Sequence, residues 1–167
     1  MEFTLKEKLM LKTKYRKYIT NSDDACEFNG ETLVILPDND IAFEMAQLFS
    51  EKTNNTVHYL LKNSISSFYS DMIINNSIQY TYNDMNSLGL PREIFIKKIR
   101  GYNFENIIDL NTNFSRFGAF LCLFCNSKVR MGFNYDNSEK YYNVILDSNY
   151  QQDLNGTFKM IQEFIKI

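Results

Sequence analysis

The segment from Phe104 to Phe133 constrains the fold more than any other part of this sequence. It begins with the short apolar run Ile107–Leu110, continues through the longer apolar stretch Phe114–Cys125, and ends in a second short run, Val129–Phe133. Short apolar runs are typical of strands that are buried on both faces, whereas the longer stretch has the length of a helix. The segment therefore predicts two parallel strands joined by a crossover helix.

The rest of the chain continues this alternation. Further strands are predicted at Thr32–Leu36, Val57–Leu61, Ser77–Thr81 and Val144–Leu146, and further helices at 3–19, 41–51, 64–74, 91–100 and 150–166. Alternating strands and helices predict an α/β fold, a three-layer sandwich around a mostly parallel, Rossmann-like sheet of five or six strands. We expect residues 1–31 to form a basic N-terminal helix and connector, and residues 32–167 a single Rossmann-like domain that ends in an amphipathic helix.

Composition excludes several classes of protein. With a net charge of −2, the chain lacks the overall basic character of a nucleic-acid-binding protein. No run of about 18 apolar residues is present, so no membrane-spanning helix is predicted. The three cysteines form an odd set without a secretory signal, which favours reduced thiols and a cytoplasmic location.

Polar residues follow two of the predicted strands. Asp38, Asn39 and Asp40 come after the first strand, and Asn111-Thr112-Asn113 comes after Ile107–Leu110. The carboxyl ends of parallel strands carry the ligand-binding loops of such folds, so these residues are candidates for binding, with Asp40 as a general base. Asp and Asn are also preferred helix caps, and each group directly precedes a predicted helix. Both interpretations remain open.

Other chemical signatures are weak or missing. There is no glycine-rich dinucleotide fingerprint and no Gly-Lys-Ser/Thr phosphate loop, so no cofactor is predicted. Cys122 and Cys125 lie late in an apolar helix rather than at a helix N-terminus, which favours core packing over redox or metal chemistry. A zinc site would need Cys26 or His58 as well, and we predict no metal site.

The leading helix is basic. Lys8, Lys12 and Arg16 share one stripe, and an apolar stripe of Leu11, Tyr15 and Tyr18 lies on another. One interpretation places this helix on an anionic membrane surface or an acidic partner. The other packs it on the domain with the lysine side facing solvent.

Two segments carry a family resemblance. Ile107-Ile-Asp-Leu-Asn111 and Lys128-Val-Arg-Met-Gly-Phe133 resemble the matching strands of glycosyltransferase family 9, the heptosyltransferase-like enzymes. Asn111 takes the place of a Gln, whereas Arg130, Gly132 and Phe133 match the family pattern directly. In its layout, the chain also resembles short uncharacterised single-domain bacterial proteins.

The resemblance implies the N-terminal, acceptor-side domain of such an enzyme. Asp40 then falls at the place of the family's base, Asn111 and Asn113 become candidate contacts of acceptor hydroxyls, and Arg130 is expected near an anionic group. Asp38, Asn39 and Thr112 are further candidates for substrate binding. The donor-binding half of the family has no counterpart in 167 residues, so a domain that does not catalyse alone is expected. The alternative is a non-catalytic protein-interaction module on the same fold, since fold alone does not establish function.

Overall fold

A computed structural model describes residues 4–20, 30–38, 40–52 and 56–165. Its centre is a six-stranded sheet in the order β3-β2-β1-β4-β5-β6, in which all neighbouring strands run parallel. The strands are β1 Thr32–Ile35, β2 Val57–Lys62, β3 Ser77–Tyr80, β4 Asn106–Asp109, β5 Val129–Phe133 and β6 Val144–Leu146. The α/β prediction with a parallel, Rossmann-like sheet is therefore confirmed.

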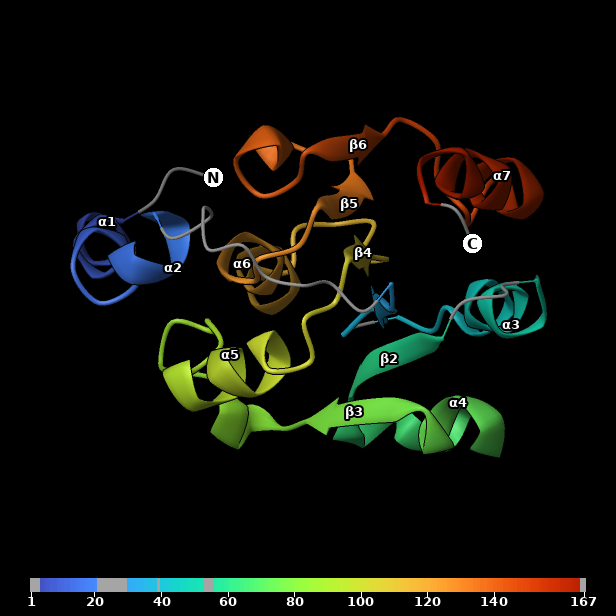
Figure 1. The fold of residues 1–167 in the computed structure, drawn as a ribbon, viewed down its shortest axis with the longest axis horizontal. Coiled ribbons are helices and arrows are strands. Elements are labelled where there is room, and N and C mark those ends of the chain that lie inside the picture. The colour runs from blue at the N-terminus through green and yellow to red at the C-terminus, as the bar shows by residue number, and fades with distance from the viewer. Residues whose placement is uncertain (1–3, 21–29, 39, 53–55, 166–167) are drawn as a thin grey trace.

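Helices cover both faces of the sheet (Figure 1). They are α1 Leu5–Lys12, α2 Arg16–Thr20, α3 Phe43–Lys52, α4 Asp71–Asn75, α5 Glu93–Arg100, α6 Arg116–Phe124 and α7 Leu154–Phe164, with short 3₁₀ turns η1 Asn63–Phe68, η2 Tyr82–Asp84 and η3 Ser138–Lys140. One face carries α5 and α6, with α1 and α2 outside α6, and the other carries α3, α4 and α7. None of the helices in the described residues is long and apolar enough to cross a lipid bilayer.

The central strands are buried on both faces, as their continuous apolar runs predict. In β1, Leu33 and Ile35 join the core beneath α5 and α6, whereas Val34 and the following Leu36 join the core beneath α3 and α7. This division follows from the two-residue period of a strand, which sends successive side chains to opposite faces. Two apolar cores therefore fix the sheet between its helical layers.

The leading segment is two helices rather than the single helix predicted over 3–19. Tyr15 is fully buried at the break between them, where its ring stacks on Phe124 of α6 at a centroid distance of 4.8 Å. Tyr18 packs on the same ring at 6.0 Å. The tyrosine stripe thus packs on the domain, while Lys8 and Lys12 are exposed.

Several helix ends differ from the sequence predictions. The helix predicted over 64–74 is divided into η1 and α4, and α5 begins at Glu93, so Pro91 is not its first residue. The closing helix begins at Leu154 because Asp153 caps it, with Oδ1 accepting a hydrogen bond from the Gly156 amide at 2.9 Å. These corrections divide one helix and move the ends of others, and the alternation of strands and helices is kept.

Candidate functional site

The strand order reverses direction between β1 and β4. The chain proceeds from β1 outward to β2 and β3, and from β4 outward to β5 and β6 on the other side. Loops that leave the two central strands therefore diverge to opposite faces, and the space at their carboxyl ends is where open α/β sheets bind ligands. The polar residues singled out after β1 and β4 lie at this place.

Asp38 and Asn111 are in contact at the switch point, the place between β1 and β4 where the strand order reverses. The Asp38 amide donates a hydrogen bond to Oδ1 of Asn111 at 3.2 Å, and the Ser115 hydroxyl donates to Oδ2 of Asp38 at 3.0 Å. Thr112 is half-buried and Asn113 is exposed in the same loop. The structure thus brings the β1 and β4 loops together; Asn39 lies outside the described residues.

Asp109, the last residue of β4, holds Asn111 of this loop through hydrogen bonds. Its fully buried carboxylate accepts hydrogen bonds at Oδ1 from the amide of Asn111 (3.0 Å) and from its side-chain Nδ2 (2.6 Å). Tyr142 donates to Oδ2 at 2.8 Å. Burial raises the pKa of Asp109 to about 6, although the Asn111 and Tyr142 hydrogen bonds act in the opposite direction. Asp109 therefore positions Asn111 and is itself inaccessible to solvent.

Two glycines make room for the Asp109–Tyr142 pair. A Cβ on Gly118 would lie 2.5 Å from Oδ2 of Asp109, and a Cβ on Gly132 would lie 2.4 Å from the Tyr142 ring. Tyr135 donates a hydrogen bond to the Tyr142 hydroxyl at 3.0 Å, which extends the chain of donors. Burial raises the pKa of Tyr142 well above its usual range, so this hydroxyl keeps the proton that it donates.

Ser115 is the cap of α6. Its hydroxyl accepts a hydrogen bond from the Gly118 amide at 3.2 Å, and the helix begins at Arg116. The prediction that Asn111-Thr112-Asn113 caps a helix starting at Phe114 is therefore wrong. The amide side chain of Asn111 is instead held between Asp109 and Asp38.

We expect Ser115→Ala to lower the free energy of unfolding by about 1 kcal/mol, because α6 loses its cap and Asp38 loses a hydrogen-bond donor. Urea denaturation measures this change. Ser66→Ala, which removes a hydroxyl that donates a hydrogen bond to the Asn63 carbonyl within η1, is the matched control and should change stability by less than about 0.5 kcal/mol. Equal effects of the two variants would contradict the capping role.

Asp40 lies at the other end of the β1–α3 loop and is exposed. Its Oδ1 accepts a hydrogen bond from the Ile41 amide at 2.8 Å, and its Oδ2 accepts one from Nε2 of Gln151, in the loop after β6. Because α3 begins at Phe43, the prediction that Asp40 caps this helix is wrong. The Ala42 amide just before the helix donates to the Tyr69 hydroxyl instead, at 3.1 Å.

A shallow hollow of about 420 Å³ lies beside Asp40, between the β1–α3 and β6–α7 loops. Its lining includes Ile41, Phe43, Glu44, Tyr150, Gln151 and Leu154. The Tyr150 hydroxyl is buried and has no hydrogen-bond partner among the described residues. Burial and the nearby charge of Asp40 raise the pKa of Tyr150, so it is a neutral donor at the wall of the hollow.

Arg130 does not join this group. It lies near the amino end of β5, paired with Ile107 of β4, and its amide donates to Oδ1 of Asn143 at 2.7 Å. Its charge acts on the buried thiols Cys122 and Cys125, on the face covered by α6. The structure thus separates Arg130 from the polar residues at the carboxyl ends of β1 and β4.

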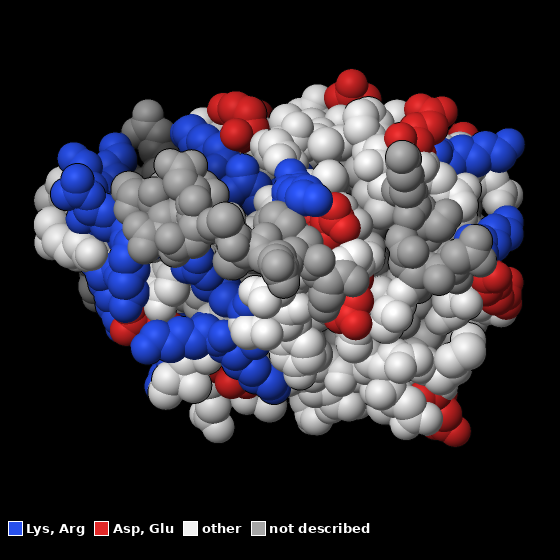
Figure 2. Space-filling view, in the orientation of Figure 1, with Lys and Arg blue, Asp and Glu red and all other residues white. Residues whose placement is uncertain are grey.

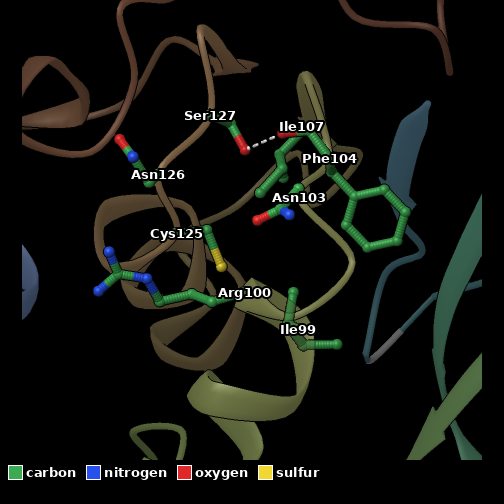
Figure 3. A pocket seen from close by; sticks show the side chains of 8 residues that line it. All are labelled: Ile99, Arg100, Asn103, Phe104, Ile107, Cys125, Asn126 and Ser127. Carbon is green, nitrogen blue, oxygen red and sulfur yellow. Dashed lines mark hydrogen bonds between the residues drawn. The ribbon is translucent and has the colours of Figure 1, made fainter. Parts of the chain in front are cut away.

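A second cavity lies away from the switch point (Figure 3). It has about 20 Å³, room for a single water molecule, and it lies among Arg100, Cys125 and Ser127, whose hydroxyl donates to the Phe104 carbonyl at 2.8 Å. Burial raises the pKa of Cys125 to about 12, so its thiol is protonated and inert. No group of three or more His, Cys, Asp or Glu side chains in the described residues is arranged to hold a metal ion.

Several residues of this region could not be predicted from the sequence. Glu44, Tyr150 and Gln151 carry no local motif, and only the folded chain brings them to Asp40. Gly132 did offer a signal, since glycine within a strand often marks the close approach of another group. Comparison with family models, curated proteins and solved structures gives no match.

Proposed function

We propose that this chain binds a hydroxyl-rich ligand of the acceptor-sugar class in the hollow beside Asp40, as a glycosyltransferase-like domain that does not catalyse alone. The observation that carries the proposal is the composition of that hollow. Glu44 and Gln151 supply a carboxylate and an amide, and Ile41, Phe43 and Leu154 supply an apolar surface. A few convergent polar groups on an apolar wall are typical of small-molecule sites.

The chemistry of these groups suits a sugar acceptor. Carboxylate and amide oxygens accept hydrogen bonds from hydroxyl groups, and amide N–H groups donate to them. Asp40 is exposed and adjacent, where a carboxylate can take a proton from an acceptor hydroxyl. The residue implied as the base by the family resemblance thus lies beside the hollow.

The same hollow does not suit a nucleotide-sugar donor. None of the described residues that line it is Lys or Arg, and Glu44 adds negative charge. A donor pyrophosphate needs cations, a metal ion or oriented amides to stabilise its charge. A hollow that suits an acceptor but not a donor would form half of a transferase site, so we propose that transfer requires a second component.

Thermal-shift assays of the whole chain against a panel of methyl glycosides and nucleotide sugars test the proposal. We expect a methyl glycoside to raise the melting temperature by several degrees, and both Asp40→Ala and Glu44→Gln to abolish the shift. Asp40 is exposed, so Asp40→Ala should change the free energy of unfolding by less than about 1 kcal/mol. Glu163→Ala, which removes an exposed carboxylate from α7, is the matched control and should retain the shift.

A protein-interaction module is the second candidate, favoured by the apolar rim of the hollow. Ile41 and Phe43 are 44% and 36% exposed at its edge, where they could contact an apolar side chain of a partner protein. This alternative predicts stable self-association or capture of a partner that Ile41→Ser removes, with no response to any glycoside. Light scattering of the purified chain and its Ile41→Ser variant distinguishes the two.

A further inference from the structure

The surface over α1, α2 and α5 concentrates positive charge. Figure 2 shows Lys and Arg gathered on the side of the molecule that Figure 1 assigns to these helices. Its exposed cations are Lys8, Lys12, Lys14, Arg16, Lys17, Arg92, Lys97 and Lys98. Among the acidic side chains described in these helices, Glu93 alone offsets them. A chain of net charge −2 therefore carries a strongly asymmetric charge distribution.

Apolar side chains lie exposed among these cations. On α1, Leu5 and Leu9 are 86% and 63% exposed and alternate with Lys8 and Lys12 at positions i, i+3, i+4 and i+7 of one helix face. On α5, Ile94 is 84% exposed. A lysine face that stays in solvent has no need for exposed leucine and isoleucine. The combination therefore indicates a surface that becomes buried when the protein binds something.

Contacts around α2 and α5 hold this part of the surface together. Lys17 of α2 forms an ion pair with Glu93 of α5 at 2.7 Å, and the Tyr15 hydroxyl donates to the Pro91 carbonyl at 3.2 Å. The guanidinium of Arg100 lies 5.4 Å from the centre of the Tyr18 ring. Since Tyr15 and Tyr18 are buried against α6, α2 and α5 are anchored to the same core. The cations of α2 and α5 are therefore presented by a folded surface.

We propose that this surface, the α1–α5 basic face, binds the surface of an anionic membrane. Lysine and arginine are attracted to acidic lipid headgroups, and exposed leucine and isoleucine insert at the boundary between headgroups and acyl chains. A polyanion such as RNA would explain the cations but not the apolar residues of α1 and α5. An anionic lipid surface uses both kinds of side chain.

The proposal is independent of the hollow beside Asp40. The basic face lies on the α5–α6 side of the sheet, whereas the hollow lies between the loops that lead into α3 and α7, on the other side. A chain bound to a membrane through α1 and α5 would keep the hollow open to ligand. Failure of sugar binding and failure of membrane binding are therefore separate results.

Co-sedimentation of the full chain with lipid vesicles tests the proposal. We expect binding to phosphatidylcholine vesicles that contain about one-third phosphatidylglycerol, weak binding to pure phosphatidylcholine, and loss of binding as NaCl is raised. Lys97→Glu/Lys98→Glu should weaken binding about tenfold or more, since it reverses two charges on the face. Lys52→Glu/Lys159→Glu, a matched reversal of two exposed lysines on α3 and α7, should change binding less than about twofold.

The apolar residues provide the discriminating variant. Leu5→Ser/Leu9→Ser retains every cation and alters only exposed side chains, so it should fold normally while losing most vesicle binding. Binding of the unaltered chain to a fluorescent single-stranded RNA but not to the acidic vesicles would overturn the proposal in favour of a polyanion site. Equal binding to neutral and acidic vesicles, or equal loss with both lysine pairs, would also overturn it.

Discussion

Gly132→Ala is expected to destabilise the fold by about 3 kcal/mol. The added Cβ would lie 2.4 Å from the ring of Tyr142, a side chain that is 3% exposed and hydrogen-bonded to Asp109. The ring cannot withdraw without breaking that hydrogen bond and leaving a buried carboxylate with one donor fewer. Overpacking and the loss of a bond to a buried charged group each cost about 1–3 kcal/mol. Urea denaturation at neutral pH measures the change.

Gly156→Ala is the matched control for this prediction. Its Cβ would lie even closer to a neighbour, 2.1 Å from Oδ2 of Asp153. Asp153 is an exposed helix cap, so its carboxylate can rotate away, at a cost of about 1 kcal/mol for the lost cap. The higher helix propensity of Ala offsets about the same amount. We expect nearly unchanged stability; if Gly132→Ala were equally harmless, the described packing of Tyr142 would be wrong.

Tyr142→Phe is expected to destabilise the protein by about 2 kcal/mol at pH 7, and by clearly less at pH 4. At pH 7 Asp109, whose pKa is about 6, is ionised and loses one of its three hydrogen-bond donors. Bonds to a buried charged group are worth about 1.5–3 kcal/mol, more than those to a neutral one. At pH 4 the folded protein holds Asp109 protonated, so the same deletion removes a bond between neutral groups.

The unaltered protein should show the related pH dependence. Burial raises the pKa of Asp109 from 3.8 in the unfolded chain to about 6 in the fold, so the folded state holds its proton longer. The contribution of Asp109 to stability is complete below about pH 4 and is lost as the pH rises through 6, by about 3 kcal/mol. Asp109→Asn should remove this decline, measured as the free energy of unfolding against pH.

Tyr135→Phe provides the control for Tyr142→Phe. Its hydroxyl donates to another neutral hydroxyl, that of Tyr142, at 3.0 Å, so its deletion should cost about 1 kcal/mol at both pH values. A loss on Tyr142→Phe that is the same at pH 4 and pH 7 would show that Asp109 does not change its ionisation between them.

The strands were predictable because their signal is local and strong. β5 and β6 have the predicted bounds, β1, β2 and β3 differ by one residue at their C-terminal ends, and β4 is displaced by one residue at both ends. Their apolar runs are short and continuous, and burial on both faces of a parallel sheet requires that pattern. The order of the strands was not predictable in this way, because it depends on which crossover packs on which face.

Helix ends were less predictable because several residues compete for each cap. At α6 three Asn and Thr residues precede Ser115, and the folded structure uses Ser115 because Asp109 and Asp38 hold Asn111. At α3 the exposed Asp40 bonds to Gln151 across 111 residues of sequence, a contact that no local pattern contains. Arg130 was grouped with the site by family resemblance, whereas its register beside Ile107 places it nearer the amino end of its strand.

The candidate site was therefore predictable in part. Asp38 and Asn111 were candidates because each follows a parallel strand. That they are in contact depends on β1 and β4 being neighbours in the sheet, which the sequence did not predict. The hollow itself depends on the loop after β6, which supplies Tyr150 and Gln151. No motif singled out those residues, because their importance arises only from their place in the folded chain.

A titration of the ¹⁵N-labelled chain with methyl glycosides, followed by two-dimensional amide NMR, tests the proposed sugar site most directly. We expect saturable shifts concentrated at the amides of Ile41, Glu44, Gln151 and Leu154, which line the hollow, and their loss in Asp40→Ala. Absence of shifts with every glycoside, or shifts confined to residues away from the β1–α3 and β6–α7 loops, would contradict it.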